Sequence, residues 1–378
     1  MKKVLFVATV VKLHIMVFHI PYLEWFKKNG YEVHVCARND YENKDECKIP
    51  FCDKFYDLPF ERLPFKKNNI YVLKELKNII DINRYDIIHC HTPMGGALGR
   101  LAAREARNNG TKVIYTAHGF HFYKGAPIIS WLVYYPVERW LARYTDILVT
   151  INKEDYNRAK KFKKVRVEYV PGVGIDTDRF ENVKTDKEKK RESLGIGNDE
   201  FMILSVGELN KNKNHQMIIK AIARLNNRKV KYVLCGQGPL KNELIKLSQD
   251  LKVEKQVRFL GFRDDVSEIY KVADLFVFPS YREGLSLSLM EAMSSGLPVV
   301  CSNIRGNKDL IKDGEGGYLI NLDNIEGFRE AIKKLVDNDS LRKKMGRYNT
   351  TLVEKYSIDC IIEKMVDLYT ELLSNSNN

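Results

Sequence analysis

Two glutamates, Glu283 and Glu291, are separated by seven residues in a segment that follows a short apolar run. The pattern predicts a strand, a turn at Gly284, Leu285 and Ser286, and then a helix. Unpaired N–H groups and the dipole at the start of a helix favour phosphate oxygens, and Glu283 lies beside them in sequence. Glu291 falls further into the helix, where its carboxylate can accept hydrogen bonds from vicinal hydroxyls such as those of a ribose. On spacing alone, a capping acid and a solvated helix acid are the simpler interpretation.

The same two glutamates could be the acid/base pair of a glycosidase. Glycosidase carboxyl groups lie about 5–9.5 Å apart. Eight residues of helix rise about 12 Å, at about 1.5 Å each. The spacing therefore argues against glycoside hydrolysis.

Lys213 follows another predicted strand, 201–206, six residues after Gly207. A strand, a glycine turn and a lysine just before a helix can neutralise a diphosphate, because Lys acts there as a point charge. Strand ends often carry lysine, so this signal is weak by itself. Gly236 and Gly238 form a Gly-x-Gly after a further strand, but the third glycine of the dinucleotide fingerprint is absent.

Histidines are concentrated in the first half of the chain. His118 directly follows the predicted strand 112–116, at the end of a sheet where active sites assemble. His89 and His91 end the strand before it and would share one face, so a metal site with His118 or His121 is geometrically feasible. No carboxylate lies close in sequence to complete the ligand set, so we expect no metal. His118 is instead a candidate to hydrogen-bond a substrate.

Cysteine usage and the first residues indicate the compartment. The cysteines are odd in number and scattered, which suits a reducing compartment, and the close pair Cys47 and Cys52 has no second pair to complete a zinc site. Residues 1–11 mimic a signal peptide, but Lys12 and His14 end the apolar run and no cleavage site follows. We expect a buried first strand and a cytoplasmic protein without a membrane span, since no window holds about 18 apolar residues.

The length of 378 residues is enough for two domains, because single cores stop growing near about 250–300 residues. Short β-branched runs alternate with helical patterns along the chain, which is typical of parallel sheets built from βαβ units. We expect an α/β fold of two doubly wound, Rossmann-like domains that face a central cleft, where such folds bind ligands. The expected parts are an N-terminal domain at 1–175, a linker or exposed helix at 176–200, a C-terminal domain at 201–354, and a helix at 355–378 that crosses back to the first domain.

The formal net charge of +13 is concentrated in residues 1–175. Such an excess attracts anionic surfaces such as phospholipid headgroups, a diphosphate-bearing acceptor or nucleic acid, or it simply keeps the protein soluble. The aromatic segment 127–141, and Lys66 and Lys67 after Phe65, favour contact with a lipid interface. A core helix with aromatic packing is an equally good interpretation of residues 127–141.

Taken together, these segments resemble the family 4 glycosyltransferases, which have the two-domain GT-B architecture and transfer a sugar from a nucleotide donor with retention at the anomeric carbon. The likeness spans nearly the whole chain and is strongest in the pattern of Glu283 and Glu291. The loop at His118, Lys213 after its glycine, and the junction segment 171–180 add to it. The sequence is most similar to bacterial exopolysaccharide, capsule and O-antigen members, whose acceptors are lipid-linked sugars.

The resemblance implies that the second domain binds the donor. Lys213 would hold the diphosphate and Glu291 the ribose, while Arg263 would lie beside the base. The donor-binding residues that the resemblance implies are Gly207, Lys213, Arg263, Gly284, Leu285, Ser286 and Glu291. It further implies uridine as the base, and no cofactor or metal besides the nucleotide-sugar substrate.

The resemblance also implies two catalytic residues. Glu283 would bind the donor sugar, and His118 would bind sugar hydroxyls near the reacting carbon. The implied chemistry is front-face attack, in which the departing phosphate helps to deprotonate the acceptor. An inverting route with His118 as general base is the alternative from the residues alone.

Two positions depart from the family pattern. Many relatives have Arg after the glycine that precedes the lysine, whereas this chain has Glu208, so half of the usual diphosphate clamp is missing or supplied elsewhere. Relatives often carry a Gly-Gly pair after the first strand, where this chain has Lys12, Leu13 and His14.

We therefore expect a retaining hexosyltransferase that moves a sugar from a UDP-sugar to a polyprenyl-diphosphate-linked acceptor in surface polysaccharide synthesis. We expect it to be peripheral to the inner face of the cell membrane, in contact with anionic lipid. The alternatives are a nucleotide-sugar epimerase of the same fold, which needs no acceptor, and a basic nucleic-acid-binding protein. Nucleic-acid binding explains the charge but not Glu283, Glu291 and His118, so we expect no nucleic acid partner.

Overall fold

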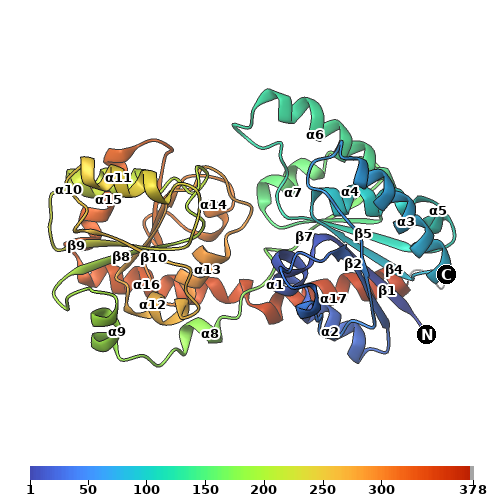
Figure 1. Ribbon diagram of the computed structural model, residues 1–378, viewed down its shortest axis with the longest axis horizontal. Helices are drawn as coiled ribbons and strands as arrows, with labels where there is room; N and C mark the ends of the chain where they lie inside the picture. The colour runs from blue at the N-terminus through green and yellow to red at the C-terminus, as the bar shows by residue number, and fades with distance from the viewer. Residues whose placement is uncertain (375–378) are drawn as a thin grey trace. The chain divides into compact units, whose positions relative to one another are not determined.

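A computed structural model describes residues 1–374 of the chain. The chain forms two units: unit 1 combines Met1–Gly174 with the segment that starts at Ile358, and unit 2 is Ile175–Ser357. In each unit, a sheet lies between helices on its two faces (Figure 1). No helix within residues 1–374 is long and apolar enough to cross a membrane.

Unit 1 contains a seven-stranded sheet in which every pairing is parallel. The order across the sheet is β3-β2-β1-β4-β5-β6-β7. The strands are β1 (Lys3–Val10), β2 (Glu32–Arg38), β3 (Lys54–Asp57), β4 (Ile87–His91), β5 (Lys112–Ala117), β6 (Ile147–Thr150) and β7 (Arg166–Tyr169). The central strands are buried almost throughout, as expected for a parallel sheet with helices on both faces.

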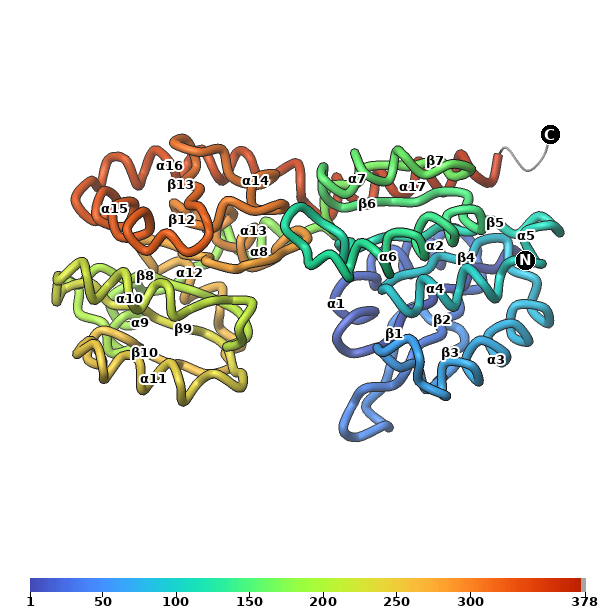
Figure 2. The backbone as a smooth tube through the Cα atoms, turned by 90° about the horizontal axis from the view of Figure 1, so that it is seen from above, coloured from blue at the N-terminus to red at the C-terminus, as the bar shows by residue number. Residues whose placement is uncertain are grey.

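Two helical layers cover this sheet. One face carries α3 (Lys67–Asn83), α4 (Pro93–Ala102), α5 (Arg104–Asn108), α6 (Ile128–Leu141) and α7 (Lys153–Ala159). The other carries the π-helix η1 (Val11–Ile15), α1 (Met16–Phe18), α2 (Ile20–Lys28) and the C-terminal helix α17 (Ile358–Ser374). Figure 2 shows α17 beside β7, where Arg166 Nη1 lies 2.5 Å from Glu371 Oε1.

Unit 2 repeats the plan with a six-stranded parallel sheet in the order β10-β9-β8-β11-β12-β13. The strands are β8 (Phe201–Val206), β9 (Val230–Cys235), β10 (Val257–Gly261), β11 (Leu275–Phe278), β12 (Val299–Ser302) and β13 (Gly317–Ile320). One face carries α10 (Gln216–Leu225), α11 (Lys241–Asp250) and α15 (Ile325–Val336). The other carries α8 (Asp178–Glu181), α9 (Lys187–Ser193), α12 (Val266–Val272), α13 (Leu287–Ser294) and α14 (Asn307–Leu310), and α16 (Asp339–Val353) contributes to both layers.

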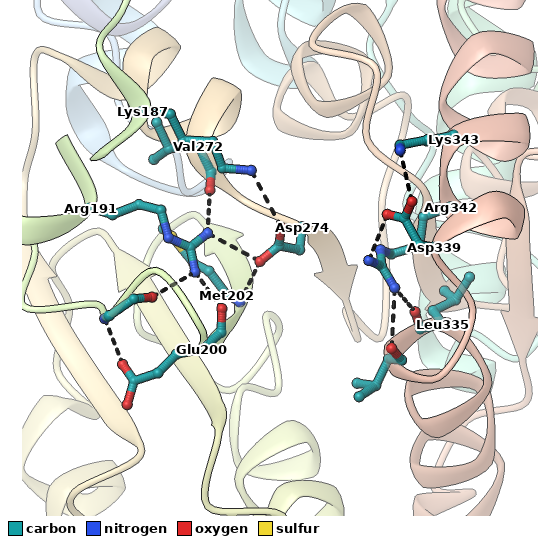
Figure 3. Close-up of polar contacts among 12 residues, drawn as sticks. Lys187, Arg191, Glu200, Met202, Val272, Asp274, Leu335, Asp339, Arg342 and Lys343 are labelled. Atoms are coloured by element: carbon teal, nitrogen blue, oxygen red, sulfur yellow. Dashed lines mark hydrogen bonds and ion pairs between the residues drawn. The ribbon is translucent and has the colours of Figure 1, made fainter. Parts of the chain in front are cut away.

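The residues expected to form a linker, 176–200, belong to unit 2. Arg191 on α9 is buried and donates to the Val272 carbonyl at 2.9 Å and to the Asp274 carboxylate at 3.1 Å (Figure 3). That carboxylate also accepts the backbone N–H of Met202 on β8 at 2.8 Å. This charge-dense segment therefore contains a helix, α9, that is fixed to the sheet by hydrogen bonds.

The doubly wound fold expected from the sequence is confirmed, including a buried first strand. Two strands, β3 and β13, were not expected. Both are four residues long and lie at the edge of their sheet, with residues that are mostly half-exposed. Such strands lack the continuous apolar run by which buried parallel strands are identified.

In each sheet the strand order reverses beside the first strand, so that β1 lies next to β4 and β8 lies next to β11. Doubly wound sheets bind ligands outside the carboxyl ends of their strands at this switch point. The loops after β8 and β11 carry Lys213 and Glu283, and the segments after β1 and β4 carry histidines in unit 1. Both switch points are therefore placed to hold ligands.

Candidate active site

Lys213 and Glu283 meet at the switch point of unit 2. Lys213 Nζ lies 2.8 Å from Glu283 Oε1, and the two side chains are only 18% and 14% exposed. Lys213 Nζ also lies 4.6 Å from the centroid of the Phe278 ring, which favours a cation over its face. The pair places a cation and a carboxylate at the switch point, where doubly wound sheets bind ligands.

Hydrogen bonds to the backbone fix the two loops that carry this pair. The Tyr281 N–H donates to the Asn212 carbonyl at 2.8 Å, and the Asn212 side-chain Nδ2 donates to the Arg282 carbonyl at 2.9 Å. Arg305 Nε donates to the Glu283 carbonyl at 3.2 Å from the far side of that loop. The Lys213 N–H is held by Asn210 Oδ1 at 3.0 Å. The charged pair is therefore positioned before any ligand arrives.

Glycines bring these loops close together. Gly236 has φ +146°, and a Cβ there would lie 1.9 Å from the Gly207 carbonyl oxygen. A Cβ at Gly238 would lie 2.5 Å from the Leu209 carbonyl oxygen. Gly236 and Gly238 are thus required by the packing of the loop beneath Lys213, which accounts for the Gly-x-Gly pattern without a phosphate.

The predicted turn 284–286 leads into α13, and Ser286 is its N-cap residue. Ser286 is buried and its Oγ lies 3.0 Å from Ser288 Oγ, while Leu285 packs on the core of unit 2. A Cβ at Gly306 would lie 2.1 Å from the Gly284 carbonyl oxygen. The turn is therefore clamped in place, with the start of α13 directly after Glu283.

Glu291 lies inside α13 and is held by Tyr270, whose hydroxyl is 3.0 Å from Glu291 Oε2 and 2.9 Å from the Ser288 carbonyl. Burial raises the pKa of Glu291, while the hydrogen bond from Tyr270 and the charge of Arg179 act in the opposite direction. A carboxylate in this position is not the solvated helix acid that spacing alone favoured.

Arg263 lies after β10, two strands away from β8. Its Nε and Nη2 bind the two oxygens of Asp265 at 2.7 and 2.5 Å, and Lys190 Nζ lies 2.5 Å from the same carboxylate. Arg263 holds the pKa of Asp265 well below its usual range, with Lys190 adding to the effect. Arg263 is thus separated by β9 from the strand that leads to Lys213, and it is already paired.

His118 follows β5 in unit 1 and joins a cluster of imidazoles. His118 Nε2 lies 3.4 Å from His91 Nδ1, and the ring centroids of His118 and His14 are 4.7 Å apart. His19 also belongs to the cluster, with its centroid 3.8 Å from that of His91. Burial lowers the pKa of His118 to about 4, so the ring is neutral at neutral pH.

The histidines that the sequence analysis grouped around a metal differ from those that the structure brings together. His89 Nδ1 forms a hydrogen bond with the Tyr369 hydroxyl at 2.7 Å, and its Nε2 forms one with the Thr116 hydroxyl at 2.8 Å. His89 therefore has no nitrogen left to bind a metal. The His121 ring stacks on Tyr134 at 4.6 Å between centroids. The cluster contains His14 and His19 in place of His89 and His121, and no pattern in the sequence predicts this grouping.

Two family models match the chain. The model described as "Glycosyl transferase 4-like" matches residues 3–152 in unit 1, and "Glycosyl transferases group 1" matches residues 186–351 in unit 2. The second range contains Lys213, Glu283 and Glu291. The boundary between the two units, after Gly174, lies between the two matched ranges.

Curated relatives cover most of the chain. The chain is 41% identical over 374 residues to the protein described as a glycosyltransferase, EpsD of Bacillus subtilis, covering 98% of this chain and 96% of that one. It is 31% identical over 327 residues to the UDP-Gal:alpha-D-GlcNAc-diphosphoundecaprenol alpha-1,3-galactosyltransferase of Escherichia coli, covering 83% and 84% of the two chains. The relatives favour neither the epimerase nor the nucleic-acid-binding alternative.

Solved structures show the same fold. HepE of Anabaena, solved in complex with UDP, superposes with a TM-score of 0.79 at 18% identity, covering 98% of this chain and all of that one. WaaG, described as a glycosyltransferase of lipopolysaccharide biosynthesis, superposes with a TM-score of 0.72 at 20% identity, covering 97% and 99%. The architecture is therefore GT-B, as the sequence analysis predicted. Residues 186–351 in the second unit match the group 1 glycosyl transferase model, and this chain belongs to the glycosyltransferases.

Proposed function

We propose that the protein is a retaining, family 4 hexosyltransferase that uses a UDP-sugar and extends a polyprenyl-diphosphate-linked glycan in surface polysaccharide synthesis. The 31% identical relative from Escherichia coli is named for a UDP-galactose donor and a diphosphoundecaprenol acceptor. The Campylobacter jejuni relative, 32% identical over 333 residues, is also named for a diphospho-undecaprenol acceptor. The observation that carries the proposal is the Lys213–Glu283 pair at the switch point of the group 1 domain.

Lys213 and the start of α13 are proposed to bind the donor diphosphate. In the free protein the positive charge of Lys213 is balanced by Glu283 at 2.8 Å. A diphosphate provides more negative charge than one carboxylate, so Lys213 turns to it when the donor binds. Glu283 is then free to accept hydrogen bonds from the hydroxyls of the donor sugar, and the backbone N–H groups of 284–286 face the phosphate.

Glu291 is proposed to bind the ribose. Its Oε2 accepts the Tyr270 hydroxyl, which fixes the orientation of the carboxylate and leaves the other oxygen for a ribose hydroxyl. Arg263 is proposed to lie beside the base, held by Asp265 at 2.7 and 2.5 Å. Glu208, which replaces the expected arginine, accepts the Asn210 amide at 2.8 Å. It therefore helps to shape the loop rather than adding positive charge.

Sugar transfer breaks the bond between the anomeric carbon and the phosphate oxygen, and the electron pair stays on the phosphate. The acceptor hydroxyl oxygen bonds to the same face of that carbon, and its proton passes to the departing phosphate. Lys213 and the helix start stabilise the charge that develops on the leaving group, which is the largest contribution in many transfer reactions. Positive charge fixed in advance requires no reorganisation during the reaction.

His118 is proposed to contact hydroxyls of the transferred sugar. A pKa of about 4 keeps its ring neutral, so it can donate one hydrogen bond, but it is a weak base. General bases work best when their pKa lies near the operating pH. This supports the retaining route, in which the phosphate accepts the proton, over the inverting route with His118 as base.

Contact with anionic lipid is proposed for α6. Its aromatic residues Trp131, Tyr134 and Tyr135 pack on the core of unit 1, so the core-helix interpretation of residues 127–141 holds for that side. Its exposed apolar residues are Ile128, Ile129, Leu132, Val133, Val137 and Trp140. Beside them lies a cavity of about 400 Å³ lined by Tyr135, Pro136, Arg139, Trp140, Arg143, Lys163 and Lys164. An exposed apolar face next to basic residues is typical of helices that lie in a lipid interface at the inner membrane face.

The proposal is tested by offering the protein a panel of nucleotide sugars with a synthetic polyprenyl-diphosphate-linked sugar. We expect transfer from a UDP-sugar, with an α-linkage when the donor is an α-linked UDP-sugar. A β-linked product from that donor would contradict retention. Turnover with another nucleotide but not with UDP would contradict the proposed base.

A further inference from the structure

Four histidines from four separate segments converge at the carboxyl end of the unit 1 sheet. His14 lies in the π-helix η1, His19 precedes α2, His91 ends β4, and His118 follows β5. One ring nitrogen from each lies within 4.8 Å of the others. Because β1 and β4 are neighbours at the point where the strand order reverses, the cluster occupies the switch point of this sheet.

Four ring nitrogens of the cluster lack hydrogen-bond partners among the described residues. Both ring nitrogens of His19, Nε2 of His14 and Nε2 of His91 are buried and form no hydrogen bond within residues 1–374. His14, His19 and His91 are 8%, 1% and 1% exposed. A buried polar atom without a partner costs free energy, and native proteins contain few of them. Several such atoms within one cluster of histidines indicate a missing binding partner.

Other buried histidines of unit 1 are fully paired. His34 uses Nδ1 on the Tyr85 hydroxyl at 2.6 Å and Nε2 on Glu32 at 2.8 Å. His89, whose ring centroid lies 4.0 Å from that of His91, uses both nitrogens on Tyr369 and Thr116. Burial alone therefore does not leave histidines unpaired in this unit.

The geometry suits a small cation. Zinc binds imidazole nitrogen at about 2.0–2.1 Å, so the nitrogens of a tetrahedral site lie about 3.4 Å apart. The distance from His118 Nε2 to His91 Nδ1 is 3.4 Å. His19, His91 and His118 also line a cavity of about 10 Å³, which is room for a single small ion.

The protonation state of the cluster also suits a metal. Burial lowers the pKa of His14, His19 and His91 well below the ordinary value, and neighbouring histidines lower it further. The rings are therefore neutral at neutral pH, which is the form that binds metals. Imidazole is a preferred ligand of zinc, whereas hard cations such as magnesium prefer oxygen.

We propose that His14, His19, His91 and His118 bind one Zn²⁺ ion. The sequence analysis expected no metal because no carboxylate lies nearby in sequence, but four imidazoles complete a tetrahedral shell without one. The π-helix that carries His14 is a rare local structure that is frequent at functional sites.

The ion would also orient His118. With Nε2 bound to zinc, the proton of the neutral ring resides on Nδ1, which becomes a fixed hydrogen-bond donor. His118 is the least buried of the four histidines, so this donor is the one nearest to solvent. The zinc site does not depend on the proposed sugar transfer, and it adds to the role proposed there for His118.

The test uses the full chain, purified without a metal-affinity step and depleted of metal with a chelator. Zinc is titrated in competition with a chromophoric chelator, and metal content is measured by mass spectrometry after desalting. We expect about one zinc per chain. Replacement by cobalt should produce the strong visible absorption of a tetrahedral cobalt site. Absence of stoichiometric zinc binding, or a weak octahedral cobalt spectrum, would overturn the proposal.

The variant His14→Gln/His19→Gln removes two ligands, and its affinity for zinc should be at least tenfold lower. His121→Gln is the matched control, since His121 lies three residues from His118 but stacks on Tyr134 instead. Equal loss in both variants would overturn the assignment of ligands, and circular dichroism checks folding. If the double variant does not fold, the cobalt spectrum of the unaltered chain decides the matter. UDP binding, measured in parallel, reports separately on unit 2, so failure of either proposal leaves the other standing.

Discussion

Lys213 Nζ lies 2.8 Å from Glu283 Oε1, although 70 residues separate the two in the chain. The pair joins the loop after β8 to the loop after β11, and both side chains are mostly buried. Each residue therefore holds the other in position, at the place where we propose that the donor diphosphate and sugar bind. A preformed pair of this kind makes removal of either partner costly, because the remaining charge is left uncompensated.

Replacement of Lys213 by alanine should lower kcat/KM for transfer about 10²–10³-fold, because the positive charge that stabilises the leaving phosphate is removed. The measurement is initial rate against donor concentration. Lys211→Ala, which removes an exposed lysine of the same loop, is the control and should stay within about threefold of the original enzyme. Equal rates for the Lys213 variant and the original would contradict the diphosphate role.

Replacement of Glu291 by alanine should weaken UDP binding about 10–100-fold, because hydrogen bonds to a charged group contribute about 1.5–3 kcal/mol. Tyr270→Phe removes the hydroxyl that orients this carboxylate and should cause a smaller loss in the same direction. Titration calorimetry with UDP measures both. Glu330→Ala, at an exposed position of α15, should bind as the original does. Unchanged affinity in the Glu291 variant would rule out the ribose contact.

The free energy of unfolding should depend on the protonation of His215. Burial lowers its pKa to about 4, with the charge of Lys213 adding to the effect. The unfolded chain has an ordinary histidine pKa near about 6.5, so between about pH 6.5 and 4 it binds a proton that the folded chain does not. The free energy of unfolding is therefore highest above about pH 6.5 and falls as the pH falls. The contribution of this residue lowers it by about 2 kcal/mol at pH 5. Urea unfolding from pH 4.5 to 7.5 measures the slope, which should be shallower in His215→Gln, and parallel slopes would contradict the assignment.

Two glycines with the same backbone conformation should respond differently to alanine. Gly306 has φ +78° and a Cβ there would lie 2.1 Å from the Gly284 carbonyl oxygen, whereas Gly314 has φ +77° with nothing within 4 Å. Gly314→Ala should cost about 1–2 kcal/mol of stability from the left-handed conformation alone. Gly306→Ala should cost more and also weaken UDP binding, because the turn before α13 must move. Melting temperature and UDP affinity are the two measurements. Equal effects in both variants would contradict the idea that the close contact between Gly306 and the Gly284 carbonyl holds the turn in place.

The exposed face of α6 should bind anionic membranes. Leu132 and Ile129 are 67% and 62% exposed, so Ile129→Ser/Leu132→Ser should lower binding to anionic vesicles without a large loss of stability. Flotation with phosphatidylglycerol vesicles at low and high salt measures this, and binding should weaken with salt. Phe262→Ser removes an apolar side chain of unit 2 that is 71% exposed, and it should bind as the original does. Full binding by the α6 variant would exclude this surface.

Much of the fold is determined by local pattern. Continuous apolar runs between helical periods are enough to predict β1, β4, β8 and β11, because a strand buried on both faces must be apolar throughout. The glycine turn before Lys213 and the turn between Glu283 and α13 follow from the same pattern. Their placement at adjacent strands follows from the doubly wound order. The short edge strands β3 and β13 cannot be predicted in this way, because half-exposed strands have no continuous apolar run.

The sequence by itself therefore determined the two-sheet plan, since the strands of a doubly wound sheet are marked by continuous apolar runs. The residues proposed for the unit 2 site follow from the family resemblance. Only the tertiary structure decided which histidines meet. His14, His19, His91 and His118 come from four segments, and their convergence depends on the pairing of β1 with β4 and of β4 with β5. It likewise decided that Arg191 is buried within a segment whose composition indicates a linker. Long-range contacts of this kind leave no periodicity in the sequence, because the partners are chosen by sheet topology rather than by spacing.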